Sequence, residues 1–306
     1  MLHTVLNKVM RQIAAIALFF LSTEQKRTLE RRMRGREEFR KLSQADAVVV
    51  SFGKSGRTWL RVMLSRYYQL QHGLSEKNLI GFDNLHRKNA SIPRIFFTHD
   101  NYLADFTGNR DSKCDFYATK VVLLVRNPQD VAVSQFHQWK FRMKEHKKAI
   151  NRYPRDPETP IFDFVMGEAA GIPKICDFMN RWADELPRMK DLLVIRYEDM
   201  RADPATYLTQ VVELLEGSAD PAHIDAAVEF ASVENMRKLE TSSVFSSGRM
   251  KPGDKSNPDS FKVRRAKVGG YRDYFEDDEV ERIDALVEQQ LSPAFGYSSA
   301  DEPASG

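Results

Sequence analysis

The sequence predicts a single α/β domain with a central parallel sheet flanked by helices. Three features indicate this fold. Short β-branched apolar runs recur at 47–50, 121–125 and 192–195. Segments with apolar residues at helical spacing separate these runs, which is typical of strands that alternate with helices. With 306 residues the chain can bury one large core, and no linker rich in Pro, Gly and Ser divides it.

The first part of the chain, residues 1–42, is predicted to be a helical extension of this domain. Seven apolar residues recur there at helical spacing: Leu2, Val5, Leu6, Val9, Ile13, Ile16 and Phe20. Its unbroken apolar run, Ile13–Leu21, is too short to span a bilayer, and no signal-peptide cleavage site follows. Two interpretations stay open for residues 1–22, a helix on a membrane surface or a helix packed on the core. The charged stretch Glu24–Lys41 predicts a solvated helix.

Residues 47–60 form the stretch on which the predicted function depends. The apolar run ends at Gly53-Lys54-Ser55-Gly56, and apolar residues at helical spacing follow, which predicts a strand, a turn and a helix. Such a turn directs backbone N–H groups and the positive end of the helix dipole at one point, where an anion binds. Lys54 supplies a mobile charge, and Ser55 and Thr58 supply hydroxyl donors. We therefore predict a P-loop-type domain.

A nucleoside triphosphate loop is a poorer match to this stretch. Its spacing requires glycine where Val48 stands, and a kinase of that type needs an acidic residue after a second strand to hold magnesium. Here the strand at 121–125 is followed by Arg126, which predicts a second anion site and no metal. An ATP-dependent kinase therefore remains an alternative that these residues disfavour.

Two further strands are predicted to end at the same edge of the sheet. Ile92–His99 reads as a buried strand that ends at a histidine, and carboxyl ends of parallel strands are where ligands bind. Residues 192–200 are predicted as the next strand. The remaining expectations are a solvated helix and loop at 136–160, helical spacing over 161–186, a long mobile loop at 239–263, an amphipathic helix at 279–290 and a disordered tail at 298–306. The main domain is expected to cover 43–297.

Three blocks of the sequence resemble those of the sulfotransferases that use 3′-phosphoadenosine 5′-phosphosulfate (PAPS), especially the soluble cytosolic-type family. Residues 54–59 resemble the Lys-Ser-Gly-Thr-Thr-Trp of their phosphosulfate loop. Residues 126–134 match their Arg-Asn-Pro-x-Asp-x-x-Val-Ser block, and residues 264–275 resemble their late loop Arg-Lys-Gly-x-x-Gly-Asp-Trp-Lys-Asn-x-Phe. The blocks occur in the same order as in that family. The resemblance implies sulfonate transfer from PAPS to a hydroxyl or amine by in-line attack, without a metal.

The resemblance also implies a role for each matching residue. Lys54, His99 and Ser134 are the expected catalytic residues: Lys54 follows the charge on the departing phosphate, His99 takes the acceptor's proton and Ser134 restrains Lys54. An unperturbed histidine, with a pKa of about 6.5, suits that proton transfer. The expected donor-binding residues are Lys54, Ser55, Gly56, Arg57, Thr58, Trp59, Arg126, Ser134, Tyr197, Ser232, Arg264, Arg265 and Ala266.

This chain departs from the family pattern at several positions. Arg57 replaces the first threonine of Gly-Thr-Thr-Trp, and Ala266 replaces the glycine of the late loop. Phe97 replaces the lysine that the family carries two residues before its histidine, so one positive charge near the transferring group is missing. Arg57 is a candidate to supply it.

The composition excludes some partners and leaves others open. The 46 basic and 43 acidic residues nearly cancel, which gives no support for a nucleic-acid partner. The two cysteines, Cys114 and Cys176, lack metal-ligand spacing and suit a reducing compartment. We expect a cytoplasmic enzyme, with residues 1–22 as a candidate contact with the cytoplasmic face of a membrane. The acceptor is expected to be a small phenol or alcohol, or a lipid or glycan hydroxyl; a non-catalytic membrane-surface binding protein is the other alternative. The sequence gives no indication of oligomeric state.

Overall fold

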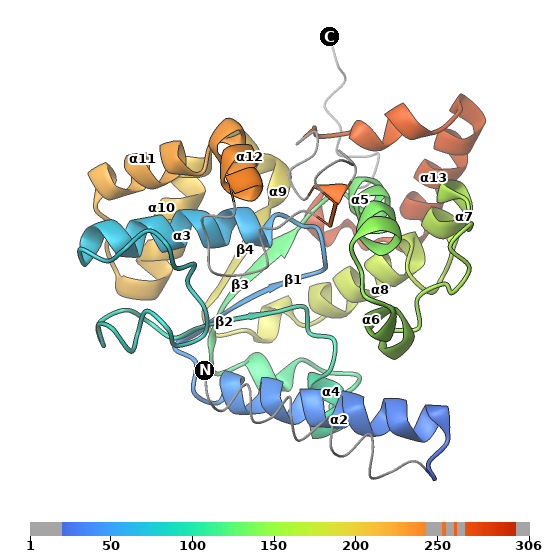
Figure 1. Cartoon of the computed structure of the whole chain (residues 1–306), viewed down its shortest axis with the longest axis horizontal. Coiled ribbons are helices and arrows are strands. Elements are labelled where there is room, and N and C mark those ends of the chain that lie inside the picture. The colour runs from blue at the N-terminus through green and yellow to red at the C-terminus, as the bar shows by residue number, and fades with distance from the viewer. Residues whose placement is uncertain (1–19, 243–252, 255–259, 262–266, 298–306) are drawn as a thin grey trace.

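The computed structural model of the chain describes residues 20–242, 253–254, 260–261 and 267–297. Its centre is a four-stranded parallel sheet with the strand order β2-β1-β3-β4 (Figure 1). The strands are β1 (Ala47–Ser51), β2 (Ile95–Thr98), β3 (Lys120–Val125) and β4 (Leu192–Arg196). The predicted α/β fold with a flanked parallel sheet is confirmed.

Helices precede, connect and follow these strands. They are α2 (Thr23–Leu42), α3 (Arg57–Gln71), α4 (Leu103–Thr107), α5 (Pro128–Phe141), α6 (Glu145–Ile150), α7 (Ile161–Met166), α8 (Ile172–Ala183), α9 (Tyr197–Ala202), α10 (Pro204–Glu216), α11 (Pro221–Phe230), α12 (Val233–Ser242) and α13 (Asp277–Gln290). Short 3₁₀ turns lie at Cys114–Phe116, Leu186–Arg188, Gly270–Tyr274 and Pro293–Phe295. The helix predicted at 279–290 is confirmed as α13, which begins two residues earlier.

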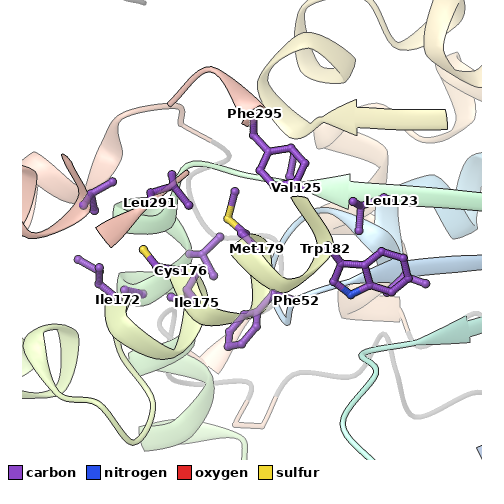
Figure 2. Close-up of a cluster of buried hydrophobic side chains, with 14 of the residues drawn as sticks. Phe52, Leu123, Val125, Ile172, Ile175, Cys176, Met179, Trp182, Leu291 and Phe295 are labelled. Carbon is purple, nitrogen blue, oxygen red and sulfur yellow. The ribbon is translucent and has the colours of Figure 1, made fainter. Parts of the chain in front are cut away.

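Helices cover both faces of the sheet, so the side chains that alternate to the two sides of each strand are buried on both faces. Val49 and Val122 join the core cluster that includes residues of α3, α10 and α11. Val48 and Leu123 join the other cluster, with residues of α5, α8 and α13. Figure 2 shows part of this second cluster, where Ile175, Cys176, Met179 and Trp182 of α8 lie near Leu123 and Val125 of β3. Burial on both faces explains why the strands read as continuous apolar runs.

The carboxyl ends of all four strands lie at one edge of the sheet. β2 and β3 lie on either side of β1. The chain therefore runs from β1 to one side of the sheet and from β3 to the other, so the strand order reverses between β1 and β3. In open α/β sheets this is where ligands bind. The loop after β1 and Arg126 after β3 therefore meet at this edge, as the sequence indicates.

The N-terminal helix α2 is not a solvated helix, contrary to the expectation for Glu24–Lys41. It packs side by side with α4 (Figure 1). Gly35 is buried at this contact, where an added Cβ would lie 2.2 Å from the Tyr102 carbonyl oxygen. Arg31 of α2 also forms an ion pair with Asp105 of α4 at 2.9 Å. The many charged residues of this segment gave no indication that one face of the helix packs on α4.

The packing corrects two other expectations, and it divides one stretch that was correctly expected to be helical into two helices. Residues 136–160 do not begin as a solvated segment, because Phe136 and Trp139 are buried on α5. The helical spacing over 161–186 belongs to two helices, α7 and α8, separated near Gly171, where a Cβ would lie 2.1 Å from the Val165 carbonyl oxygen. The last predicted strand ends at Arg196, and Tyr197 begins α9.

Some predictions fall on residues outside those described. They include most of the predicted helix at 1–22, most of the loop at 239–263, the three late-loop residues Arg264, Arg265 and Ala266, and the tail at 298–306. Within the described ranges, no helix combines the length and apolar character needed to cross a membrane.

Candidate functional site

The loop between β1 and α3 has the backbone conformation of an anion-binding turn. Lys54 has φ 73° and Gly56 has φ 85°, so the chain turns sharply through two left-handed residues before α3 begins at Arg57. An added Cβ on Gly56 would lie 2.6 Å from the Tyr197 ring, so glycine is required for both conformation and space. The N-terminus of α3 therefore points its backbone N–H groups toward the carboxyl edge of the sheet.

A large cleft opens at this edge, with a volume of about 1400 Å³. Most of the predicted site residues that the structure describes line it: Lys54, Gly56, Arg57, Thr58, Trp59, His99, Arg126, Ser134 and Tyr197. Two others do not. The buried Ser55 is not among the lining residues, and Ser232 lines a smaller pocket beside α11 and α12. The structure therefore brings together residues from four of the sequence segments that suggested a site.

Arg126 connects the loop to the far side of the cleft. Its Nη1 donates to the Lys54 carbonyl oxygen at 3.1 Å, and its guanidinium lies 4.3 Å from the centre of the Tyr197 ring. The Tyr197 ring in turn meets Trp59 edge to face at 6.2 Å, and Trp59 Nε1 donates to the Ala231 carbonyl oxygen at 2.8 Å. Two aromatic rings and a guanidinium thus form one corner, which suits a planar base next to a phosphate.

Asp130 organises this corner; it is the aspartate of the matched block at 126–134, but the sequence alone assigned it no role of its own. Its carboxylate is only 3% exposed and pairs with Arg126 Nη2 at 3.3 Å. It also accepts the backbone N–H groups of Gly269 and Tyr271, each at 3.0 Å. The late loop is therefore fixed beside Arg126, immediately after residues 264–266. Asp130 lies in the first turn of α5, where an aspartate is ordinarily explained by the helix dipole, so its distant partners left no local signal.

His99 lies at the end of β2 with both ring nitrogens engaged. Its Nδ1 is 2.8 Å from the Ser51 carbonyl oxygen, and because a carbonyl only accepts, Nδ1 carries the proton. Its Nε2 is 2.6 Å from Arg57 Nη2, and because a guanidinium only donates, Nε2 is the acceptor. Arg57 also donates from Nη1 to the Thr98 carbonyl oxygen. The contacts select the neutral tautomer whose lone pair, on Nε2, lies beside a cation.

The position that carries lysine in the resembling family holds an aromatic ring in this chain. Phe97 lies under the guanidinium of Arg61, which is 3.8 Å from the ring centre, and Arg61 Nη1 donates to the Ile80 carbonyl oxygen at 3.1 Å. Arg57, Arg61 and Phe97 all line the cleft. Near Phe97, the positive charge of the cleft therefore comes from the two arginines of α3, Arg57 and Arg61.

A carboxyl group also faces the cleft beside β2. Glu38 of α2 accepts the Thr98 hydroxyl and the Tyr102 backbone N–H, each at 3.3 Å. Burial, and to a smaller extent the nearby Asp100, raise the pKa of Glu38 to about 7. Among the described residues there is no cluster of three His, Cys, Asp or Glu side chains that could hold a metal ion.

The family model described as the sulfotransferase domain matches residues 44–294 of this chain. Cytosolic sulfotransferase 10 of Arabidopsis thaliana is 25% identical over 280 residues, which cover 81% of this chain and 78% of that protein. Flavonol 3-sulfotransferase of Flaveria bidentis is 25% identical over 283 residues, covering 86% of each chain. Among solved structures, a mouse sulfotransferase complexed with PAP has the same fold, with a TM-score of 0.54, 19% identity and coverage of 83% of this chain and 89% of that one.

Proposed function

The chain belongs to the sulfotransferase domain family, and we propose that this enzyme transfers a sulfonate group from PAPS to a hydroxyl or amine of an acceptor. One observation carries the choice of donor. The phosphate-type loop with Lys54 and the second cationic position at Arg126 line the same cleft, and Arg126 Nη1 donates to the Lys54 carbonyl oxygen at 3.1 Å. PAPS carries phosphate at both its 5′ and 3′ positions and therefore needs two anion sites.

The loop that follows β1 acts on the 5′ side of the donor in this proposal. As the sulfur–oxygen bond breaks, negative charge moves onto the bridging oxygen of the departing phosphate. The Lys54 ammonium and the amides at the start of α3 stabilise that charge, so they lower the barrier as well as bind the donor. Ser134 of α5 lines the same cleft and is proposed to restrain Lys54. Ser55 is kept as a proposed hydroxyl donor of the loop.

His99 is the proposed base for the acceptor. The bond from Nδ1–H to the Ser51 carbonyl fixes the ring, which leaves Nε2 to take the proton from the attacking hydroxyl. Arg57 must release Nε2 for this step, and its guanidinium then lies beside the sulfonate oxygens, where charge also accumulates. Arg57 is therefore the proposed source of the charge that Phe97 does not provide.

The corner formed by Arg126, Trp59 and Tyr197 is the proposed site of the adenosine 3′-phosphate. Arg126 supplies a guanidinium for the phosphate, and the rings of Trp59 and Tyr197 supply surfaces for the adenine. Arg264, Arg265 and Ala266 are proposed to complete the phosphate site, since they precede the late-loop residues fixed by Asp130. Ser232 remains a proposal for the adenine end, next in sequence to the cleft-lining Ala231.

We propose that the acceptor is a small hydroxylated molecule and that the enzyme is cytosolic, in line with the relatives named above. A lipid or glycan acceptor, and contact of residues 1–22 with the cytoplasmic face of a membrane, remain predictions. Deleting residues 1–22 should abolish liposome association and spare turnover of soluble acceptors if that contact exists. Unfolding of the truncated protein would instead place this segment in the core.

The proposal is tested by donor-product binding and by transfer. PAP should raise the melting temperature without magnesium, and ATP should raise it much less, because ATP lacks a 3′-phosphate. Incubation with PAPS and a panel of phenols should yield sulfated products by mass spectrometry. A preference for ATP with magnesium would favour the kinase alternative. PAP binding without transfer to any acceptor would favour a non-catalytic binding protein.

A further inference from the structure

A continuous chain of contacts leads from the His99 end of the cleft to a lysine on α8. Glu38 contacts Thr98, the residue before His99, and also contacts the backbone of Tyr102. The Tyr102 hydroxyl bonds the side chain of Asn151, and Lys174 Nζ donates to the Asn151 carbonyl oxygen at 3.2 Å. These residues all line the cleft together with His99. Lys174 therefore lies on the wall that continues from His99.

The chain of contacts closes into a ring on the other side. Lys174 Nζ lies 4.9 Å from the centre of the Tyr153 ring, and the Tyr153 hydroxyl accepts from Gln135 Nε2 at 2.5 Å. Gln135 stands next to Gly53, where an added Cβ would lie 3.0 Å from its Oε1. The ring of residues thus returns to the phosphate loop. His99, Lys174, Tyr102 and Tyr153 all line the same cleft.

Besides its contact with the Tyr153 ring, the Lys174 ammonium makes two hydrogen bonds and has no anionic partner among the described residues. Two of its three N–H groups are used, on the carbonyl oxygens of Ala169, at 2.9 Å, and Asn151. The nearby arginines of α2 each pair with a carboxylate, Arg31 with Asp105 at 2.9 Å and Arg34 with Glu30 at 2.5 Å. Burial, with a smaller contribution from Arg31, lowers the pKa of Lys174 to about 8, which is the effect expected of a cation without a counter-ion.

The pKa of His146 indicates a positive electrostatic potential in the same part of the cleft. Burial lowers the pKa of His146, and the charges of Arg34, Lys147 and Lys144 lower it further, opposed by Glu30. All of these side chains line the cleft. Lys144 and Lys147 therefore add positive charge to the cleft that Lys174 lines, which favours an anion in this part of the cleft.

We propose that Lys174 binds the carboxylate of the acceptor, so that the preferred substrates are aromatic hydroxy acids. The third N–H of Lys174 matches a single anionic oxygen, and the rings of Tyr102 and Tyr153 suit a flat body between the carboxylate and the hydroxyl that faces His99. The proposal rests on the proposed function only in naming the hydroxyl as the reacting group.

The test compares acids with their neutral amides. The probes are 4-hydroxybenzoate, 4-hydroxyphenylacetate and 3-(4-hydroxyphenyl)propanoate, each paired with the corresponding amide, and binding to the PAP-loaded protein is measured by calorimetry. At least one acid should bind about tenfold or more tightly than its amide, because it gains a charge-assisted bond. The variant Lys174→Gln should bring this ratio close to one. Lys190→Gln, an exposed lysine before the amino end of β4, should leave the ratio unchanged.

Three results would overturn the inference: no binding by any of the six compounds at millimolar concentration, equal binding of acids and amides, or a ratio that Lys174→Gln does not alter. An unchanged melting-temperature shift with PAP shows that the variant is folded. Because binding is read without turnover, a protein that binds the acids through Lys174 but transfers no sulfonate would refute the proposed function and leave this subsite intact.

Discussion

The carboxyl group of Glu38 should make the stability of the protein fall between about pH 4.5 and pH 7. Its pKa is raised from 4.5 to about 7, first by burial and then by Asp100. Across that interval the unfolded chain has released this proton and the folded chain still holds it, so rising pH favours unfolding. The difference corresponds to about 3 kcal/mol at pH 8, and this contribution is fully present below pH 4.5.

The variant Glu38→Gln removes the titration and keeps one of the two oxygen acceptors. Glu38 accepts Thr98 on Oε1 and Tyr102 on Oε2, so glutamine loses one of these bonds, at a cost of about 1 kcal/mol. At pH 4.5 the variant should therefore be slightly less stable than the wild type. At pH 8 it should be more stable, by about 2 kcal/mol, because no buried charge forms.

Urea denaturation of both proteins at several values between pH 4.5 and pH 8 measures this difference, and other titrating groups largely cancel in the comparison. Glu37→Gln is the matched control. Arg40 and Lys41 hold the pKa of Glu37 below its ordinary value against the opposing effect of burial, so its contribution is present above pH 4.5 and is lost as pH falls. The reasoning about Glu38 is refuted if the free-energy difference between variant and wild type does not change over this pH range.

Three further predictions concern the donor site. Lys54→Ala and His99→Ala should each lower kcat by about 100-fold or more, but only Lys54→Ala should also weaken PAP binding; equal loss of PAP affinity in both would contradict their separate roles. Arg126→Ala should reduce the preference for PAP over the 5′-monophosphate by about tenfold or more, measured by calorimetry, and an unaltered preference would place the 3′-phosphate elsewhere. Asp130→Asn should destabilise the fold by about 2–3 kcal/mol in urea denaturation and weaken PAP binding, whereas the exposed partner of a surface pair, Asp273→Asn, should change stability by less than about 1 kcal/mol; equal effects would show that Asp130 does not anchor the late loop.

Local sequence patterns were sufficient to predict the sheet, the loop after β1 and the second cationic position at Arg126. A β-branched run indicates a strand, glycines around Lys54 indicate a turn, and apolar spacing indicates the helix that follows. Because parallel strands end at one edge, a residue predicted at a strand end, such as His99, could be placed near the loop from its position in the chain.

The extent of individual elements depended more on packing. The charges of α2 indicated solvent, but Gly35 and Arg31 dock the helix on α4. Tyr197 follows an apolar run and was expected within a strand, yet it begins α9 against Gly56. Where an element ends and which of its faces is buried depend on the element that packs against that face. The composition of a segment is an average over all its faces and does not contain this information.

The side chains that meet in the cleft are set by tertiary packing alone. Arg57 reaches His99, 42 residues away, and thereby selects its tautomer. Asp130 fixes the late loop 139 residues further on, and Lys174 joins the wall through Asn151 and Tyr153. Contacts between segments so far apart depend on how helices pack on the sheet, and no periodicity or short motif records that packing. The residues of the proposed donor site could therefore be recognised in the sequence, whereas the contacts of His99 and Lys174 in the cleft arose only from the fold.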